Sequence, residues 1–130
     1  MREIFFKAKR KDDGKWVEGY YYKMWENHYV LWGMNNDKPD MIEIDPETLC
    51  QYTGKKDKKG KKIWEHDIVS TIVFGPSTLV HRPAAIAYDE RKTQYIAGFA
   101  YEDYVPLLAY YDDEIEVIGN VFDNPELLEE

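Results

Sequence analysis

Residues 45–69 decide the fold of this chain, and their sequence is DPETLCQYTGKKDKKGKKIWEHDIV. Asp45 followed by Pro46 is typical of a helix start, because proline loses nothing where backbone N–H groups are unpaired. We therefore expect one short helical turn there. Gly60 suits a left-handed conformation within the lysine-rich part. The β-branched residues that follow predict a core strand over residues 63–74.

Short apolar stretches separated by turn residues lie on both sides of this block. Asn124 and Pro125 repeat the cap-and-proline arrangement and predict a terminal helical turn. Between residues 33 and 40 the chain is rich in Asn, Asp and Gly, which indicates a loop that ends an N-terminal meander. The other predicted strands are residues 3–8, 16–25, 28–32, 41–44, 79–88, 93–101 and 114–121, with a strand or a helical turn at 104–111.

This pattern predicts a mainly β (β-rich α+β) fold of short antiparallel strands. We expect an N-terminal β-meander, a C-terminal SH3-like small barrel and one or two short helical turns. A length of 130 residues suits a single domain over residues 1–130, because two enzyme-sized domains would not fit. The loop at 33–40 is the place for a possible division into sub-lobes 1–38 and 39–130.

Charge and composition limit the classes of function. Residues 66–130 contain 3 Lys and Arg against 13 Asp and Glu, whereas residues 1–65 contain 14 against 12. The acidic second half would repel a phosphate backbone, so ordinary nucleic-acid binding is disfavoured. No apolar run approaches the ~20 residues that span a bilayer, and Cys50 is the single cysteine. We expect a cytoplasmic protein with no membrane association.

The lysine-rich turn at residues 55–62 is one candidate site. It contains six lysines and one aspartate, and it is either a grip for a polyanion or a solvated hairpin tip. The turn itself lacks the arginine or aromatic side chains that read or stack on bases, which favours the solvated tip. The possible polyanion contacts are Lys55, Lys56, Lys58, Lys59, Lys61 and Lys62.

Catalytic and metal-binding residues are sparse. His66 and Asp67 are adjacent, so on a strand they point to opposite faces and do not bind one ion together. Cys50 is a nucleophile only if a histidine lies beside it, and a lone cysteine is more often a small buried hydrophobe. Asp67 more often satisfies nearby backbone N–H groups than acts as an acid or base. We predict no catalytic residue, no metal site and no cofactor.

Aromatic residues are concentrated in the N-terminal third of the chain. Seven Trp and Tyr side chains between residues 16 and 32 exceed what one buried face can hold. The surplus predicts a subunit interface or a ligand groove, since both favour Tyr and Trp, and we favour self-association. The possible interface residues are Trp16, Tyr20, Tyr22, Trp25, Tyr29 and Trp32.

Three ordered blocks span the whole chain. They are Arg2-Glu3-Ile4-x-Phe6-x-Ala8; Asp45-Pro46-Glu47-Thr48 with Gln51-Tyr52-Thr53-Gly54, Asp57-Lys58-x-Gly60-Lys61-x-Ile63, Glu65 and Asp67-Ile68-Val69; and Ile118-Gly119-Asn120-Val121-Phe122-Asp123-Asn124-Pro125-Glu126-Leu127. These blocks resemble the YopX family of phage and prophage proteins. The resemblance implies a phage or prophage gene in a bacterial cell and a compact, oligomeric protein, and it implies no reaction.

Three positions depart from the pattern of the family. Cys50 and His66 stand where glycine is common, and Lys55 stands where an aliphatic residue is usual. If a glycine before Asp-Ile-Val serves a tight turn, His66 needs a different local backbone or tolerates strain.

The sequence as a whole predicts a non-enzymatic protein that acts by protein association, as a homo-oligomer or with a host or phage protein. One alternative is a nucleic-acid-associated accessory protein that uses the lysine turn. A small hydrolase built around Asp67 with His66 or Cys50 is a third possibility.

Overall fold

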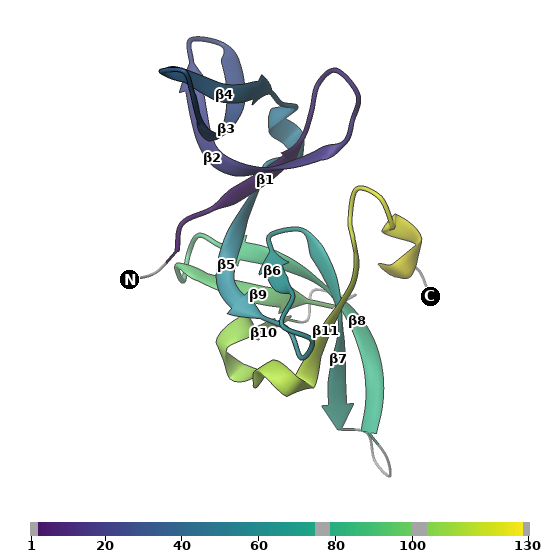
Figure 1. Ribbon diagram of the computed structural model, residues 1–130. Coiled ribbons are helices and arrows are strands. Elements are labelled where there is room, and N and C mark those ends of the chain that lie inside the picture. Colours follow the sequence, from purple (N-terminus) through teal and green to yellow (C-terminus); the bar gives the residue numbers. More distant parts are fainter. Residues whose placement is uncertain (1–2, 75–78, 100–103, 129–130) are drawn as a thin grey trace. The chain divides into compact units, whose positions relative to one another are not determined.

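The computed structural model describes residues 3–74, 79–99 and 104–128, and the chain divides into two compact units, Met1–Tyr52 and Thr53–Glu130 (Figure 1). Whether they act as one domain, with sub-lobes 1–38 and 39–130, stays a prediction. Among the described residues, no helix is long and apolar enough to cross a membrane. The elements are β1 (Phe6–Lys9), β2 (Trp16–Met24), β3 (Asn27–Asn35), β4 (Lys38–Glu43), η1 (Pro46–Thr48), β5 (Cys50–Lys56), β6 (Lys62–Trp64), β7 (Asp67–Phe74), β8 (Leu79–Asp89), β9 (Gln94–Gly98), β10 (Tyr104–Pro106), η3 (Leu107–Ala109), η4 (Asp112–Glu114), β11 (Ile115–Asn120) and η5 (Pro125–Leu128).

The mainly β prediction is confirmed, because antiparallel strands dominate both units. In the first unit the strand order is β4-β3-β2-β1, and the start of β5 pairs with β1. Gly19 lies where β2 passes from β1 to β3, and a Cβ there would be 2.3 Å from the carbonyl oxygen of Leu31. The buried core of this unit is Ala8, Val30 and Ile44, with Val17, Ile42 and Leu49 packed against it.

The loop predicted at residues 33–40 is wrong. β3 continues to Asn35 and β4 begins at Lys38, so only Asn36 and Asp37 form the turn, with φ of 51° and 62°. Asn and Asp tolerate the left-handed conformation that a two-residue hairpin requires. Pro39 is accommodated because β4 is an edge strand in this unit, where a missing N–H costs little.

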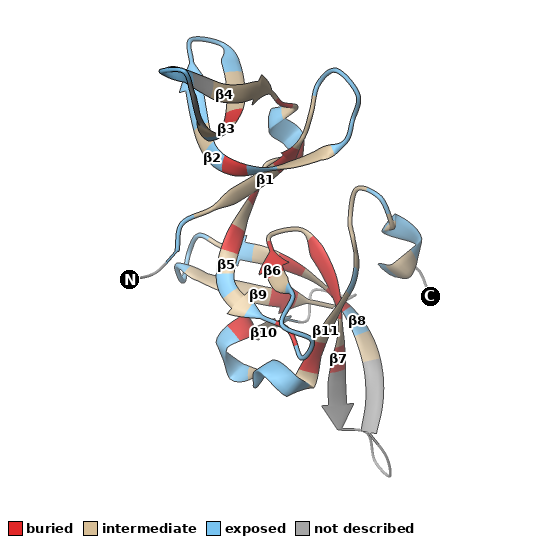
Figure 2. Ribbon diagram, in the orientation of Figure 1, coloured by how far each residue is buried: buried red, intermediate tan, exposed pale blue. Residues whose placement is uncertain are grey.

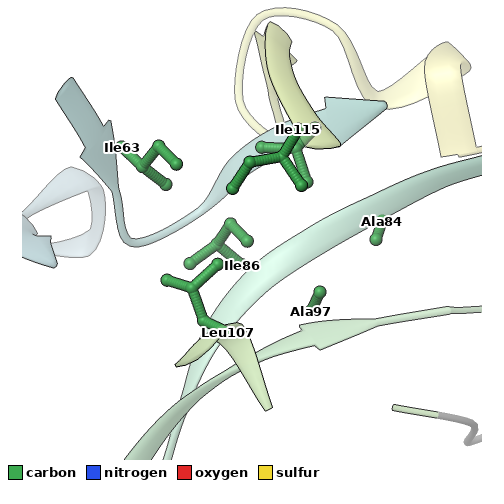
Figure 3. Close-up of a cluster of buried hydrophobic side chains, with 7 residues drawn as sticks. Ile63, Ala84, Ile86, Ala97, Leu107 and Ile115 are labelled. Atoms are coloured by element: carbon green, nitrogen blue, oxygen red, sulfur yellow. The ribbon is translucent and has the colours of Figure 1, made fainter. Parts of the chain in front are cut away.

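The second unit contains β6, which pairs with β5, and a five-stranded sheet of order β10-β9-β8-β7-β11. Its buried core draws side chains from β6, from this sheet and from η3, as the close-up shows (Figure 3). Both ends of the described sheet are edges, so the SH3-like barrel is not confirmed. The core residues are Ile63, Val69, Ala84, Ile86, Ala97, Leu107 and Ile115.

The single strand predicted over residues 63–74 is wrong, because β6 ends at Trp64 and β7 begins at Asp67. His66 lies in the intervening turn with φ of 69°, a conformation that glycine adopts more easily. Of the two alternatives expected for His66, a different local backbone or tolerated strain, the structure therefore shows tolerated strain. Its backbone N–H donates to the Ile86 oxygen at 2.8 Å, and its oxygen accepts from the Val121 N–H at 2.9 Å. The turn is therefore held from both sides.

Both predicted helical turns are confirmed as 3₁₀ turns. The Asp45 carboxylate accepts a hydrogen bond from the Glu47 N–H at 3.1 Å and so caps η1. The second turn is η5, which begins at Pro125. The end of the strand predicted at residues 93–101 lies outside the described residues, at positions 100 and 101. Burial concentrates on the strands of each unit, whereas most hairpin tips are exposed (Figure 2).

Candidate functional site

The first unit carries an aromatic face on the side of its sheet opposite to the core. Tyr20 is paired with Leu31 and Tyr22 with Tyr29, and side chains that are paired across strands share one face. Tyr21 is paired with Val30, which is fully buried, so the other face is the packed one. We define the aromatic face as Trp16, Tyr20, Tyr22, Met24, Tyr29 and Leu31.

Much of this face is open to solvent. Tyr20 is 59% exposed, Tyr22 48% and Met24 38%, whereas Trp16 and Tyr29 are half-buried. The Tyr20 ring contacts Phe5 edge-on, with 5.7 Å between ring centroids. At the other end of β2, the ammonium groups of Lys7 and Lys9 lie 4.7 and 5.5 Å from the Trp16 ring centroid. Trp16 is thus covered by cations, and the tyrosines remain accessible.

Trp25 extends the face into the β2–β3 turn. It is 83% exposed and its φ is 54°, in the left-handed region. For a residue with a Cβ this conformation costs about 1–2 kcal/mol. Within the described part of the chain, Trp25 makes no hydrogen bond or ring contact. The two-residue turn therefore exposes one of the four tryptophans of the chain almost completely.

The remaining predicted interface residue, Trp32, is 49% exposed and lies at the irregularity between Leu31 and Gly33.

Tyr21 was not in the predicted interface set, and in the structure it lies on the face opposite to its neighbours Tyr20 and Tyr22. Its hydroxyl lies 2.5 Å from Nδ1 of His28, and the two rings are stacked. Tyr21 thus has partners on the packed face. That the six predicted residues form an interface stays a prediction.

The lysine turn is organised around Asp57, which is 4% exposed. Its Oδ1 accepts from the backbone N–H groups of Lys59 and Lys61, both at 2.9 Å, and its Oδ2 accepts from the Val117 N–H at 2.9 Å. Gly60 has the predicted left-handed conformation, with φ of 79°. The Lys58 N–H donates to the Ile115 oxygen, so the turn covers the edge strand β11.

Half of the lysines in this turn are held by carboxylates. Lys58 and Lys59 both contact Glu116, at 3.3 and 2.7 Å. Lys55 donates to the Tyr110 oxygen at 2.7 Å and to Asp112 at 3.0 Å. Lys56 and Lys61 are exposed and make no ion pair within the described residues, and Lys62 is half-buried. Much of the charge available to a polyanion is therefore compensated inside the unit.

The pKa values in this turn follow from the same contacts. Burial alone would raise the pKa of Asp57, but hydrogen bonds from the backbone N–H groups of Val117, Lys61 and Lys59 lower it below its usual 3.8. The ammonium groups of Lys59 and Lys58 lower the pKa of Glu116. Asp57 is therefore ionised at neutral pH and serves as a structural acceptor.

Each residue of the hydrolase alternative has a structural contact. The Asp67 carboxylate is buried and accepts from the Trp64 N–H at 2.9 Å. The His66 ring contacts Phe122 edge-on at 5.4 Å between centroids. The buried Cys50 thiol lies 3.2 Å from the Thr48 oxygen. Among the described residues, no group of three or more His, Cys, Asp and Glu could hold a metal ion. Whether the protein lacks enzymatic activity stays a prediction.

The second unit also has a pocket of about 250 Å³ that the sequence did not indicate. Its lining comes from β5, the β8–β9 turn, β9 and η3, which are far apart in the sequence. Leu108 is 78% exposed beside the buried Leu107, and nothing in the sequence distinguishes these two neighbouring leucines. The lining residues are Thr53, Lys55, Thr93, Gln94, Tyr95, Leu107 and Leu108, and we call it the Leu108 pocket.

Two comparisons relate the chain to known proteins. The model of a family described as YopX protein matches residues 5–129. The fold is similar to that in the crystal structure of protein EF1440 from Enterococcus faecalis, with a TM-score of 0.61 and 22% sequence identity over 99% of this chain and 100% of that chain. At this identity the likeness shows the fold alone. A search of curated proteins gave no match.

Proposed function

The chain belongs to the YopX family, and we propose that it is a non-enzymatic protein, encoded by a phage or prophage, that acts in the bacterial cytoplasm by protein association. The surface that carries this association is the aromatic face together with Trp25. The phage origin rests on the family resemblance of the sequence. The partner is a second copy of the chain or another protein.

The exposure of Trp25 is the observation that carries the proposal. A tryptophan that is 83% exposed on a left-handed backbone contributes neither burial nor local stability to its own unit. Tyr and Trp are enriched among the residues that dominate binding energy at protein interfaces. Tyr20, Tyr22 and Met24 lie along the same strand and extend the accessible apolar surface around this residue.

The edge strands β4 and β11 favour association through the aromatic face over edge-to-edge pairing of sheets. β4, the edge strand of the first unit, contains Pro39 and the charged residues Lys38 and Asp40, which oppose edge-to-edge pairing. In the second unit the lysine turn covers β11, as described above. The lysine turn therefore has a structural role, and half of its charge is compensated. For this reason we do not propose nucleic-acid binding.

Size-exclusion chromatography with light scattering, together with capture of partners from bacterial lysate, tests this function. We compare the wild-type protein with a variant in which Tyr20, Tyr22 and Trp25 are all changed to Ser. All three side chains are exposed, so the variant should fold. Leu128→Ser, an exposed leucine in the second unit, is the matched control. A wild-type protein that stays monomeric at high concentration and captures nothing that the triple variant loses would refute the proposal.

A further inference from the structure

We propose that Trp25 of one copy inserts into the Leu108 pocket of a second copy. The inference rests on the proposed function and adds to it the partner, which is another molecule of this chain, and the receiving surface. It joins two observations that lie in different units: an exposed side chain without contacts, and a pocket without an occupant from its own unit. The experiment below separates failure of this contact from failure of association.

The pocket suits one large apolar side chain. Its volume of about 250 Å³ is below the ~300–1,000 Å³ typical of sites for drug-sized ligands. Tyr95, Leu107 and Leu108 provide apolar walls, and Leu107 is anchored in the core of the second unit. Leu108 is 78% exposed at the rim, so covering it removes apolar surface from water.

A cation in the lining favours an aromatic ring over an aliphatic side chain. Lys55 lines the pocket, and its ammonium group is held at 2.7 Å by the Tyr110 oxygen and at 3.0 Å by Asp112. The side chain is only 21% exposed, so the ammonium group is fixed in place, and its ion pair with Asp112 offsets part of the charge. An ammonium group near the face of an indole is attracted by the ring quadrupole, and Trp is the best of the aromatic partners. The same chain uses this contact at Trp16, where two lysines lie over the ring.

The charges next to the two surfaces are complementary. Lys23 precedes the β2–β3 turn, is exposed and has no partner within the described residues. On the other side, η4 follows Tyr110 and contains Asp112, Asp113 and Glu114, of which the exposed Asp113 likewise has no described partner. Glu26, which follows Trp25, is exposed as well, and the exposed Arg91 and Lys92 precede Thr93 of the pocket, so each surface carries charges of both signs. Opposite charges are thus available on both sides of the contact to fix its register.

Backbone strain is found on both sides of the contact. Thr93, at the rim, is β-branched and has φ of 51°, which is an outlier for this residue type. Trp25 has φ of 54°. Both residues lie in hairpin turns, where positive φ values occur, and residues of this kind also gather at binding surfaces. A contact between two different surfaces closes as a reciprocal dimer or as a ring.

Complementary variants test the contact. Trp25→Gly removes the inserted side chain and relieves the strained backbone, so it should fold. Leu108→Asp places a charge at the rim and leaves the buried Leu107 in place. We expect each variant alone to associate about 30-fold or more weakly than the wild type, as for truncation of a dominant interface residue. Leu128→Asp, a matched change on η5, should associate like the wild type.

Mixing the two variants gives the decisive result. Trp25→Gly retains an intact pocket and Leu108→Asp retains Trp25, so an equimolar mixture should form a 1:1 heterodimer, measured by light scattering and native mass spectrometry. A mixture that stays monomeric overturns the inference. So does a Leu108→Asp protein that assembles like the wild type, although the proposed function then stands if the triple serine variant loses assembly. A monomeric wild type also overturns it, and the lysate capture then decides the proposed function alone.

Discussion

Replacement of Asp57 should destabilise the second unit more than any other change in the lysine turn. The carboxylate accepts three backbone hydrogen bonds, and it is 4% exposed. In Asp57→Ala all three donors lose their acceptor. Those of Lys59 and Lys61 belong to exposed residues and reach water, whereas that of Val117 is partly buried. A hydrogen bond to a charged group contributes about 1.5–3 kcal/mol, so we expect a loss of about 3 kcal/mol.

Asp57→Asn removes the charge of the side chain and keeps its shape. The amide oxygen can retain the bonds from Lys59 and Lys61, but the amide nitrogen then faces the Val117 N–H, so that two donors meet. We expect a loss of about 2 kcal/mol. Urea denaturation followed by circular dichroism measures both variants, with Asp113→Asn as the control, because Asp113 is an exposed carboxylate without a described partner.

The same residue should make stability depend on pH. The pKa of Asp57 is lowered in the folded protein, so its contribution is fully present above the pKa of the unfolded chain and is lost as the pH falls through the lower folded pKa. The wild type should therefore lose more stability than Asp57→Asn on acidification below about pH 4. Glu116 also has a lowered pKa, but it is common to both proteins, and the difference isolates Asp57. Equal pH profiles, or a loss below about 0.5 kcal/mol in both variants, would refute the role of Asp57 as the organising acceptor.

Three further predictions concern other parts of the chain. His66→Gly should be near neutral or stabilising by up to about 1 kcal/mol in thermal unfolding, because relief of the left-handed backbone offsets the lost ring contact, whereas His66→Val should destabilise. Ile63→Ala should cost about 2–5 kcal/mol in urea denaturation, since the side chain is fully buried, and a cost below 1 kcal/mol would contradict its place in the core. Gel-shift assays at low ionic strength should show no binding of single- or double-stranded DNA, and a shift that Lys56→Ala with Lys61→Ala abolishes would restore the nucleic-acid alternative.

Three predictions that depended on local chemistry are confirmed. Asp45 caps its turn, Pro125 opens another, and Gly60 is left-handed, since each outcome is set by residues within one turn of the chain. The reading of Asn36 and Asp37 as part of a long loop is wrong, because the same residue types also form the tightest hairpins. Composition alone does not separate the two outcomes.

What the sequence could not provide depends on contacts between distant segments. Asp57 and Val117 are 60 residues apart, and nothing near either one signals the bond between them. The Leu108 pocket is equally non-local, since Thr53 and Gln94 contribute to it from separate strands. By contrast, Tyr20, Tyr21 and Tyr22 are consecutive on β2, and strand alternation alone places Tyr21 on the face opposite to the other two, as the structure shows.

The described non-glycine residues with positive φ all lie in turns, but their side chains differ in the contacts that they make. Asn36 and Asp37 adopt this conformation readily in a hairpin turn. His66 is held by backbone hydrogen bonds on both sides and by the Phe122 ring, so the fold offsets its cost. Trp25 is the first residue of the two-residue turn between Met24 and Asn27, so the hairpin determines its backbone but gives its ring no contact. The hydroxyl of Thr93 donates only to the adjacent Lys92 oxygen. Trp25 and the pocket that Thr93 lines are the two surfaces that the proposed contact brings together. An exposed indole that gains no contact within its own unit is explained if its contacts come from a second molecule.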